Sequence, residues 1–407
     1  MSAVVAVPPR GSFREMWLIT LGHALTHWYP ATFYLLLPII GAELGLSFSQ
    51  IGLIMTCQYI AGAVANIPGG VLVDTVGRKG VLMATSLFWV GFPYLLMSFA
   101  HSYLMLLACV MLVGFGNSLW HPTAIPTLAR RFPDRKGLVL SLHGMGGNVG
   151  DAIAPSVIGL LLYLFTWRNV VVLNVVPGIV VALLILVLLG TLRVGGARRD
   201  ATADGSSQSL RDYFRGLPEL LRNRSLLVLS ASSAFRSMTQ SALLTFLPLY
   251  FARELGYSSF WQGVFMSMLQ VAGFAASPVA GHLSDRMGRR SVITTSMVMT
   301  AVVLVFMALA AKSNAFVFFV ALLGFFLYAI RPVLQAWLLE ATPKNMGGTS
   351  IGVLFGAQAL GSAAGPLLGG LVADHYGLSA TFAFLAVTIV IANLFIFFMP
   401  RAEAQKA

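Results

Sequence analysis

The chain has 407 residues, of which 57% are hydrophobic and only 10% are charged. A soluble domain carries about 25% charged residues, so this composition excludes a soluble globular protein. It also excludes the disordered, collagen-like and disulfide-rich classes. The two cysteines, Cys57 and Cys109, cannot supply a disulfide framework or a four-ligand zinc site.

Twelve apolar runs follow one another along the chain, each long enough to cross about 30 Å of hydrocarbon as a helix. They cover residues 16–40, 49–73, 81–100, 104–128, 138–165, 168–190, 225–250, 260–283, 292–311, 315–340, 349–373 and 379–399. The first run is too long for the apolar core of a signal peptide, so we expect it to persist as the first helix. The prediction is an all-α membrane protein with twelve transmembrane helices.

The reason for the net charge of +12 becomes clear from the positions of the basic residues. Of the 26 lysines and arginines, 21 lie in the two tails and in every second connection, three lie in the opposite connections and two lie within the runs. This is the positive-inside pattern of membrane insertion. We therefore predict a multi-pass, monomeric protein of the cell inner (plasma) membrane, with both termini in the cytoplasm and with the lipid bilayer, not a nucleic acid, around it.

One long polar stretch, residues 191–224, separates the first six runs from the last six and is rich in Gly, Ser and Arg. This composition is typical of a linker. The sequence predicts an N-terminal six-helix half at 1–190, a cytoplasmic linker at 191–224 and a C-terminal six-helix half at 225–407.

The two halves repeat each other. The motif Asp-x-x-Gly-Arg at residues 74–78 recurs at 285–289, and Gly-x4-Pro-x3-Gly at 150–159 recurs at 361–370, both after 211 residues. Two parallel copies in one chain are a feature of transporters whose central cavity lies between the halves. The fold prediction is therefore two six-helix pseudo-repeats.

Residues 70–79 (GVLVDTVGRK) and 281–290 (GHLSDRMGRR) resemble the signature loop of the major facilitator superfamily. Residues 116–122 (GNSLWHP) and 146–150 (GGNVG) are similar to the fosmidomycin-resistance group of drug exporters within it. The resemblance implies the major facilitator fold, with helices one, four, seven and ten around the cavity. It also implies export of a phosphonate-bearing drug.

Two interpretations of the signature loops stay open. One is a tight cytoplasmic turn, in which glycine takes a positive φ and the basic residues obey the inside rule. The other is a latch, in which the aspartate engages a helix N-terminus and an arginine and holds the cytoplasmic side shut. The resemblance implies the latch, whose candidate gating residues are Asp74, Gly77, Arg78, Lys79, Asp285, Arg286, Gly288, Arg289 and Arg290.

Ionisable residues inside the runs are costly in a membrane and are candidates for function. They fall on the first, fourth, fifth, seventh and tenth runs, and several share one helix face with other polar residues. Each such face suits a water-filled lumen, although buried hydrogen bonds between helices are the alternative. The candidate substrate-binding residues are His23, His27, Tyr34, Asn117, His121, Arg236, Gln240, Tyr328, Arg331 and Gln335.

Positive charge exceeds negative charge within the runs, where Asp151 is the one acid facing Arg236 and Arg331. Guanidinium groups match carboxylate, phosphonate or phosphate, so we expect an anionic or zwitterionic substrate. Asp151 is a candidate proton carrier, and a structural partner of an arginine is the alternative. Three histidines on two helices are not a ligand set without geometry, so the sequence predicts no metal site.

The sequence holds no phosphate-binding glycine motif and no recognised nucleophile–base motif, so we predict no cofactor and no enzyme activity. The prediction is a secondary active transporter that works by alternating access, exporting a small anionic or zwitterionic compound or drug in exchange for protons. The alternative is a proton-coupled uptake symporter for a small organic anion. A membrane receptor or intramembrane enzyme is a third hypothesis, for which the sequence offers no extramembrane domain or catalytic group.

Overall fold

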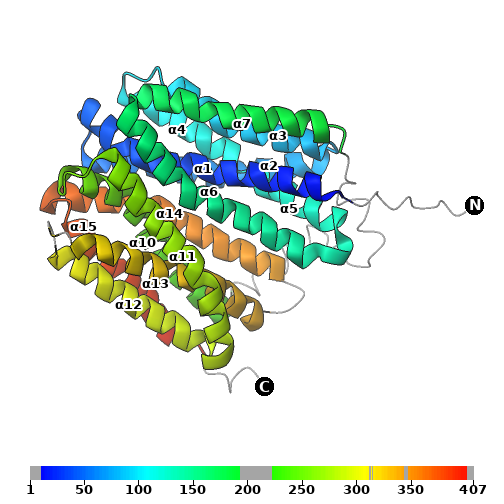
Figure 1. The fold of residues 1–407 in the computed structure, drawn as a ribbon. Coiled ribbons are helices and arrows are strands. Elements are labelled where there is room, and N and C mark those ends of the chain that lie inside the picture. Colours follow the sequence, from blue (N-terminus) through cyan, green and yellow to red (C-terminus); the bar gives the residue numbers. More distant parts are fainter. Residues whose placement is uncertain (1–10, 193–221, 311–312, 314, 343–346, 401–407) are drawn as a thin grey trace, which may run out of the picture. The chain divides into compact units, whose positions relative to one another are not determined.

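The structure is a computed structural model that describes residues 11–192, 222–310, 313, 315–342 and 347–400 (Figure 1). In these residues the regular structure is helical, without β-strands. The first half contains α1 (Phe13–Glu43), α2 (Phe48–Thr75), α3 (Lys79–Met97), α4 (Tyr103–Asn117), α5 (Trp120–Arg131), α6 (Lys136–Leu164) and α7 (Trp167–Leu189). The second contains α10 (Arg224–Arg253), α11 (Ser259–Met287), α12 (Arg289–Leu309), α13 (Ala315–Ala341), α14 (Gly347–Tyr376) and α15 (Ala380–Phe397).

The helices confirm the predicted spans. Ten helical segments of the described chain are long and apolar enough to cross a membrane, and one of them combines α4 and α5. The other two, α1 with 31 residues and α10 with 30, also exceed the length needed to cross a membrane. Together they make the predicted twelve-helix, all-α membrane protein.

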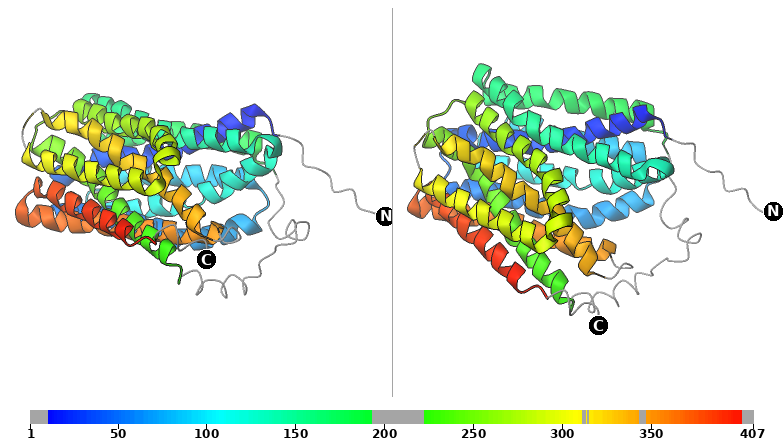
Figure 2. Two further views of the ribbon diagram at one scale, coloured as in Figure 1. Left: turned by 90° about the horizontal axis from the view of Figure 1, so that it is seen from below. Right: turned by 60° about the horizontal axis from the view of Figure 1, so that its bottom comes forward.

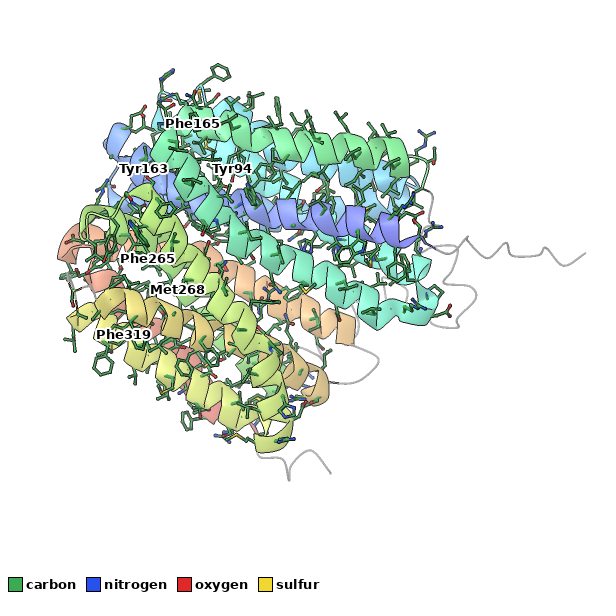
Figure 3. All side chains as sticks on the ribbon, viewed as in Figure 1. Tyr94, Tyr163, Phe165, Phe265, Met268 and Phe319 are labelled. Atoms are coloured by element: carbon green, nitrogen blue, oxygen red, sulfur yellow. The ribbon has the colours of Figure 1, made fainter. Side chains whose placement is uncertain are left out.

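Many large apolar and aromatic side chains lie on the outside of the helices (Figure 3). Tyr163, near the end of α6, is 66% exposed, and Phe165, just before α7, is 47% exposed. Aromatic side chains at helix ends are typical of the membrane–water interface. Tyr94 of α3 differs, because it is buried and its hydroxyl donates a hydrogen bond to the Tyr29 carbonyl.

The fourth predicted span is divided into two helices, α4 and α5. At Ser118 and Leu119, between α4 and α5, the helical hydrogen-bond ladder is interrupted, although both residues keep right-handed helical φ and ψ angles. Pro122, in the first turn of α5, has no N–H to donate to the Ser118 carbonyl four residues before it, which accounts for the interruption. Its counterpart Pro332 lies inside the continuous helix α13, so the two halves differ at this point.

The repeat reappears in the packing. A Cβ on Gly150 of α6 would lie 2.1 Å from the Ala24 carbonyl oxygen of α1. A Cβ on Gly361 of α14 would lie 1.9 Å from the Ala234 carbonyl oxygen of α10. Both distances are shorter than any side chain tolerates, so glycine permits the same close helix contact in each half.

The chain packs as two compact units that differ from the two sequence halves. The first comprises residues 1–32, 61–154 and 165–207, and the second comprises 33–60, 155–164 and 208–407. In the second unit, α12 packs against α13 and α15 (Figure 2). The start of α2 belongs to this unit as well, where the backbone N–H groups of Phe48 and Ser49 donate to the Asp374 carboxylate of α14 at 2.8 and 3.0 Å. The division at 191–224 stays a prediction, because most of that segment lies outside the described residues.

Candidate functional site

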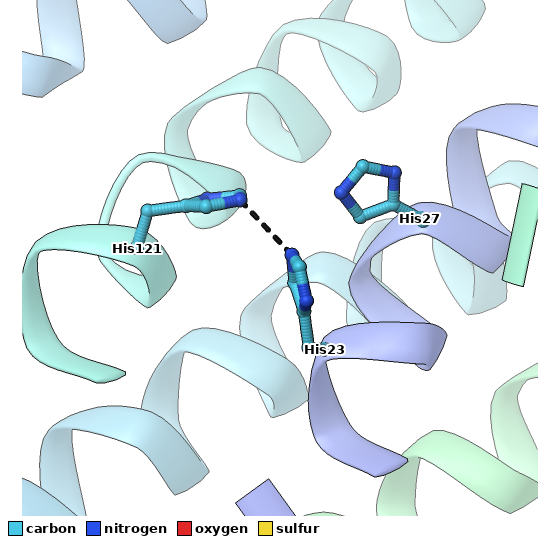
Figure 4. A group of neighbouring side chains, drawn as sticks. All are labelled: His23, His27 and His121. Atoms are coloured by element: carbon cyan, nitrogen blue, oxygen red, sulfur yellow. Dashed lines mark hydrogen bonds between the residues drawn. The ribbon is translucent and has the colours of Figure 1, made fainter. Parts of the chain in front are cut away.

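A cluster of histidines lies inside the first unit. Helix α1 contributes His23 and His27, one turn apart, and α5 contributes His121 (Figure 4). One ring nitrogen of each lies within 4.8 Å of the others, and the Nε2 atoms of His23 and His121 are 3.1 Å apart. We call these three residues the histidine cluster.

Helix α6 supplies the groups that hold the cluster in place. His23 Nδ1 donates to the His143 carbonyl oxygen at 2.7 Å, and the two rings stack at a centroid distance of 4.1 Å. His27 Nδ1 lies 2.8 Å from Asp151 Oδ2. The approach of α6 depends on Gly147, where a Cβ would lie 2.8 Å from His23 Cε1 and 2.9 Å from His27 Nε2.

Asp151 thus has a histidine partner. In the part of the chain that the structure describes, no arginine lies within 4.0 Å of its carboxylate. The His27 and Asp151 side chains are each 29% exposed, so this pair keeps access to solvent or to a ligand. A carboxylate and an imidazole are both groups that can accept and release a proton.

A pocket of about 310 Å³ lies within the second unit. Its charged groups are Arg236 from α10 and Arg331 from α13, and its polar groups include Gln240 and Gln358 from α10 and α14 and Tyr59 from α2. The lining residues include no carboxylate. We call this the arginine pocket.

The Arg236 guanidinium is buried, with only 3% of the residue exposed. Nη1 donates to Gln240 Oε1 at 2.9 Å and Nη2 donates to Ser237 Oγ at 3.3 Å, whereas Nε has no acceptor among the described residues. No carboxylate of the described chain pairs with it. A buried cation without a counter-ion is costly, and an anion entering the pocket would remove that cost.

The structure brings together some predicted substrate-binding residues and separates others. Tyr34 does not line the arginine pocket, but its hydroxyl oxygen lies 2.7 Å from that of Tyr59, which does. The Tyr328 ring packs against Gly273 of α11, and Gln335 is not among the residues that line the pocket. The side chain of Asn117, the last residue of α4, lies outside the described part.

Sequence reasoning missed Gln358, which lines the arginine pocket and donates to Ser233 Oγ at 2.6 Å. The signal that could have identified it is the position of this one amide side chain inside a long apolar run. It also missed Tyr59, because a tyrosine in such a run is common and the pocket is formed by residues far apart in the sequence.

The second signature loop forms an ion-pair chain within the second unit. Arg289 Nη1 lies 2.6 Å from Asp285, and Arg289 Nη2 lies 2.9 Å from Glu340 at the end of α13. Gly288 adopts the expected positive φ of 86°. Arg286 is exposed, and the Arg290 guanidinium lies over the Phe397 ring. Sequence reasoning missed Glu340, whose role depends on the position of α13 beside this loop.

The first signature loop is built differently. Lys79 is buried, and its Nζ donates to the carbonyl oxygens of Val73 and Val76 at the end of α2. Gly77 does not adopt a positive φ, so that expectation is wrong for this loop. The lysine explains the difference, because it satisfies carbonyls that a glycine turn otherwise would. Arg78 is exposed, and the Asp74 side chain lies outside the described residues.

Twelve membrane-crossing helices in two related sets, with charged and polar side chains gathered inside them, define a polytopic membrane transporter. The sequence profile of the Major Facilitator Superfamily matches residues 16–276 and 229–407. The chain belongs to the Major Facilitator Superfamily.

Two relatives differ in how much of the chain they match. The multidrug resistance protein MdtG of Salmonella arizonae is 35% identical over 170 residues, which are 40% of this chain and 42% of MdtG. The match therefore spans less than half of that protein. The hexuronate transporter of Bacillus subtilis is 26% identical over 375 residues, which are 88% of this chain and 87% of the transporter.

Solved structures share the fold. A bacterial homologue of the human lysosomal transporter Spinster, inward-facing and unoccupied, has a TM-score of 0.82 at 17% identity, over 95% of this chain and 97% of that one. The peptide transporter POT in complex with sulfate has a TM-score of 0.75 at 14% identity, over 98% and 97% of the two chains. These relatives are named as transporters or as a multidrug resistance protein, not as enzymes, which agrees with the prediction.

Proposed function

We propose that the protein is a secondary active transporter that exports a small anionic or zwitterionic compound by alternating access, in exchange for protons. The observation that carries the proposal is the buried Arg236 guanidinium, which pairs with no carboxylate among the described residues and lines the arginine pocket together with Arg331. Guanidinium groups bind carboxylate and phosphonate through paired hydrogen bonds. Arg236 is the principal anion ligand, while Arg331 and Gln240 orient the substrate.

Proton coupling is assigned to Asp151 and His27, whose side chains are 2.8 Å apart and partly exposed. A proton taken up by this pair changes its charge, which couples proton uptake to the alternating-access cycle. The ion-pair chain of Asp285, Arg289 and Glu340 acts as the gate. Both termini lie in the cytoplasm, and the protein works as a monomer.

The relatives support the substrate class. A hexuronate is a sugar acid that carries a carboxylate, and the hexuronate transporter matches 88% of this chain. MdtG supports the efflux of drugs, although it matches a shorter part. The resemblance to the fosmidomycin-resistance group adds a phosphonate to the candidate anions. The uptake of an organic anion together with protons remains the alternative.

Transport by purified protein in liposomes tests the proposal. Glucuronate and fosmidomycin serve as labelled probes, under a pH gradient imposed in either direction. Exchange predicts that substrate moves against the proton flow, and co-transport predicts that it moves with the flow. Transport of both probes at a rate independent of the pH gradient would contradict proton coupling, and the absence of anion transport would contradict the proposed function. The exposed Arg14→Lys variant is a control outside the pocket.

A further inference from the structure

The histidine cluster has the arrangement of a metal site. The sequence predicts no metal site because it does not show whether the three histidines lie close together. The structure shows that their ring nitrogens lie within 4.8 Å of one another. We propose that His23, His27 and His121 bind one divalent first-row transition-metal ion, with Zn²⁺ as the representative. The proposal depends on the first unit alone and not on the proposed transport function.

The tautomers of two histidines follow from their partners. A carbonyl oxygen only accepts hydrogen bonds, so His23 Nδ1 carries the proton that it donates to His143, at 2.7 Å. The carboxylate of Asp151, 2.8 Å from His27 Nδ1, holds a proton on that nitrogen in the same way. In the neutral imidazoles the Nε2 atoms of both rings therefore present lone pairs, which is the form that binds metals.

The distances suit a small ion. A zinc–nitrogen bond of about 2.0–2.1 Å in a tetrahedral site separates two ligand nitrogens by about 3.3 Å. The Nε2 atoms of His23 and His121 are 3.1 Å apart. All ligand nitrogens of the set lie within 4.8 Å of one another, so the widest pair has to shorten by at most about 1.5 Å to reach this spacing.

The outer contacts are those that support metal ligands. Metal-binding histidines usually donate their second ring N–H to a carboxylate or a backbone carbonyl, which fixes the ring and raises its basicity. His27 has the first kind of partner, Asp151, and His23 has the second, the His143 carbonyl. Gly147 leaves room for both rings, because a Cβ there would lie within 3.0 Å of each.

The donor set selects the class of ion. Three imidazole nitrogens favour zinc, nickel, cobalt or copper over magnesium and calcium, which prefer oxygen ligands. Three protein ligands also leave a fourth position for water or an anion, as in zinc sites that remain open. The 29% exposure of the His27 and Asp151 side chains gives an ion a way into the cluster.

Zinc binding by the full-length protein tests the site. The protein is purified in detergent through a tag without histidines, stripped with a chelator, and titrated with ZnCl₂ against a chromogenic chelator. We expect one zinc per chain, and a cobalt-loaded protein with the visible absorption of four-coordinate cobalt. His27→Ala and His121→Ala should each abolish the site, and Asp151→Asn should weaken zinc binding by about 10- to 100-fold.

Exposed histidines provide matched controls. His282→Ala on α11 and His375→Ala on α14 remove an imidazole of the same chemistry outside the cluster and should leave zinc affinity unchanged. Melting temperatures in the absence of metal identify variants that fail to fold, and His121→Gln replaces His121→Ala if the latter does. A wild-type protein that binds no zinc would overturn the proposal. So would zinc affinity that is equal in the wild type and in a folded His27/His121 double variant.

Discussion

Replacement of Arg236 by lysine separates the charge of the arginine pocket from its hydrogen-bonding geometry. Lysine keeps the positive charge but loses the planar fork and two of the three donor nitrogens. The lost contacts include the hydrogen bond from Nη1 to Gln240 at 2.9 Å. They also include any hydrogen bond that Nε, which has no acceptor among the described residues, donates to a bound anion. Because the residue is only 3% exposed, water cannot replace these bonds.

The expected loss can be worked out from this environment. Hydrogen bonds to charged groups contribute about 1.5–3 kcal/mol when buried. One lost anion contact should therefore weaken the binding of glucuronate by about 10- to 150-fold. The neutral methyl ester cannot use the charge-assisted contact, so its weaker binding should change little.

The assay measures the affinities of glucuronate and of its methyl ester by scintillation proximity, for wild type, Arg236→Lys and Arg236→Gln. The glutamine variant removes the charge and should bind acid and ester about equally. Arg331→Lys is the comparison inside the pocket, where greater exposure predicts a smaller loss than for Arg236→Lys. An unchanged preference for the acid in both folded Arg236 variants would refute the assignment of Arg236 as the anion ligand.

Three further variants test other parts of the molecule. Asp285→Asn should reduce transport sharply while expression stays near that of wild type, because Arg289 loses its partner at 2.6 Å but the helices keep their packing. Asp151→Asn should abolish transport driven by a pH gradient yet permit counterflow, in which substrate exchanges for substrate without net proton movement. Gly150→Ala should lower the free energy of unfolding by about 1–3 kcal/mol, because its Cβ would lie 2.1 Å from the Ala24 carbonyl oxygen.

Each of these expectations has a contrary outcome. Transport at the wild-type rate in Asp285→Asn would exclude the latch. Loss of counterflow together with a lower melting temperature in Asp151→Asn would favour a structural role for the carboxylate. For the glycine, Gly144→Ala is the control, since its Cβ meets no atom within 4 Å, and equal melting temperatures of the two variants would contradict the packing argument.

The twelve helices were predictable because the bilayer leaves few alternatives. A backbone that crosses hydrocarbon must satisfy its polar groups internally, so an apolar run of about 20 residues becomes a helix. The break between α4 and α5 was not predictable in the same way, because His-Pro and Arg-Pro give the same local signal in the two halves. Only the backbone shows that Pro122 begins a helix and that Pro332 lies within one.

The candidate sites were predictable as sets of residues but not as contacts. Helical periodicity places His23 and His27 on one face, whereas the pairing of His27 with Asp151 joins residues 124 positions apart. The sequence treats Arg236 and Arg331 alike, since both lie within apolar runs. The structure distinguishes them by burial, which depends on the helices around each residue.

The interruption between α4 and α5 also determines how this span is turned in the bilayer. Hydroxyl groups compensate part of the break, because Ser118 donates to the Phe115 carbonyl and Thr123 to the Leu119 carbonyl, both at 2.8 Å. Lipid tails cannot satisfy the backbone groups that remain. The side of the span that carries Ser118 and Leu119 must therefore face protein or water, which fixes the rotation of α4–α5 about its own axis. Pro332, inside α13, also has no N–H to donate to the carbonyl four residues before it, so α13 meets the same requirement.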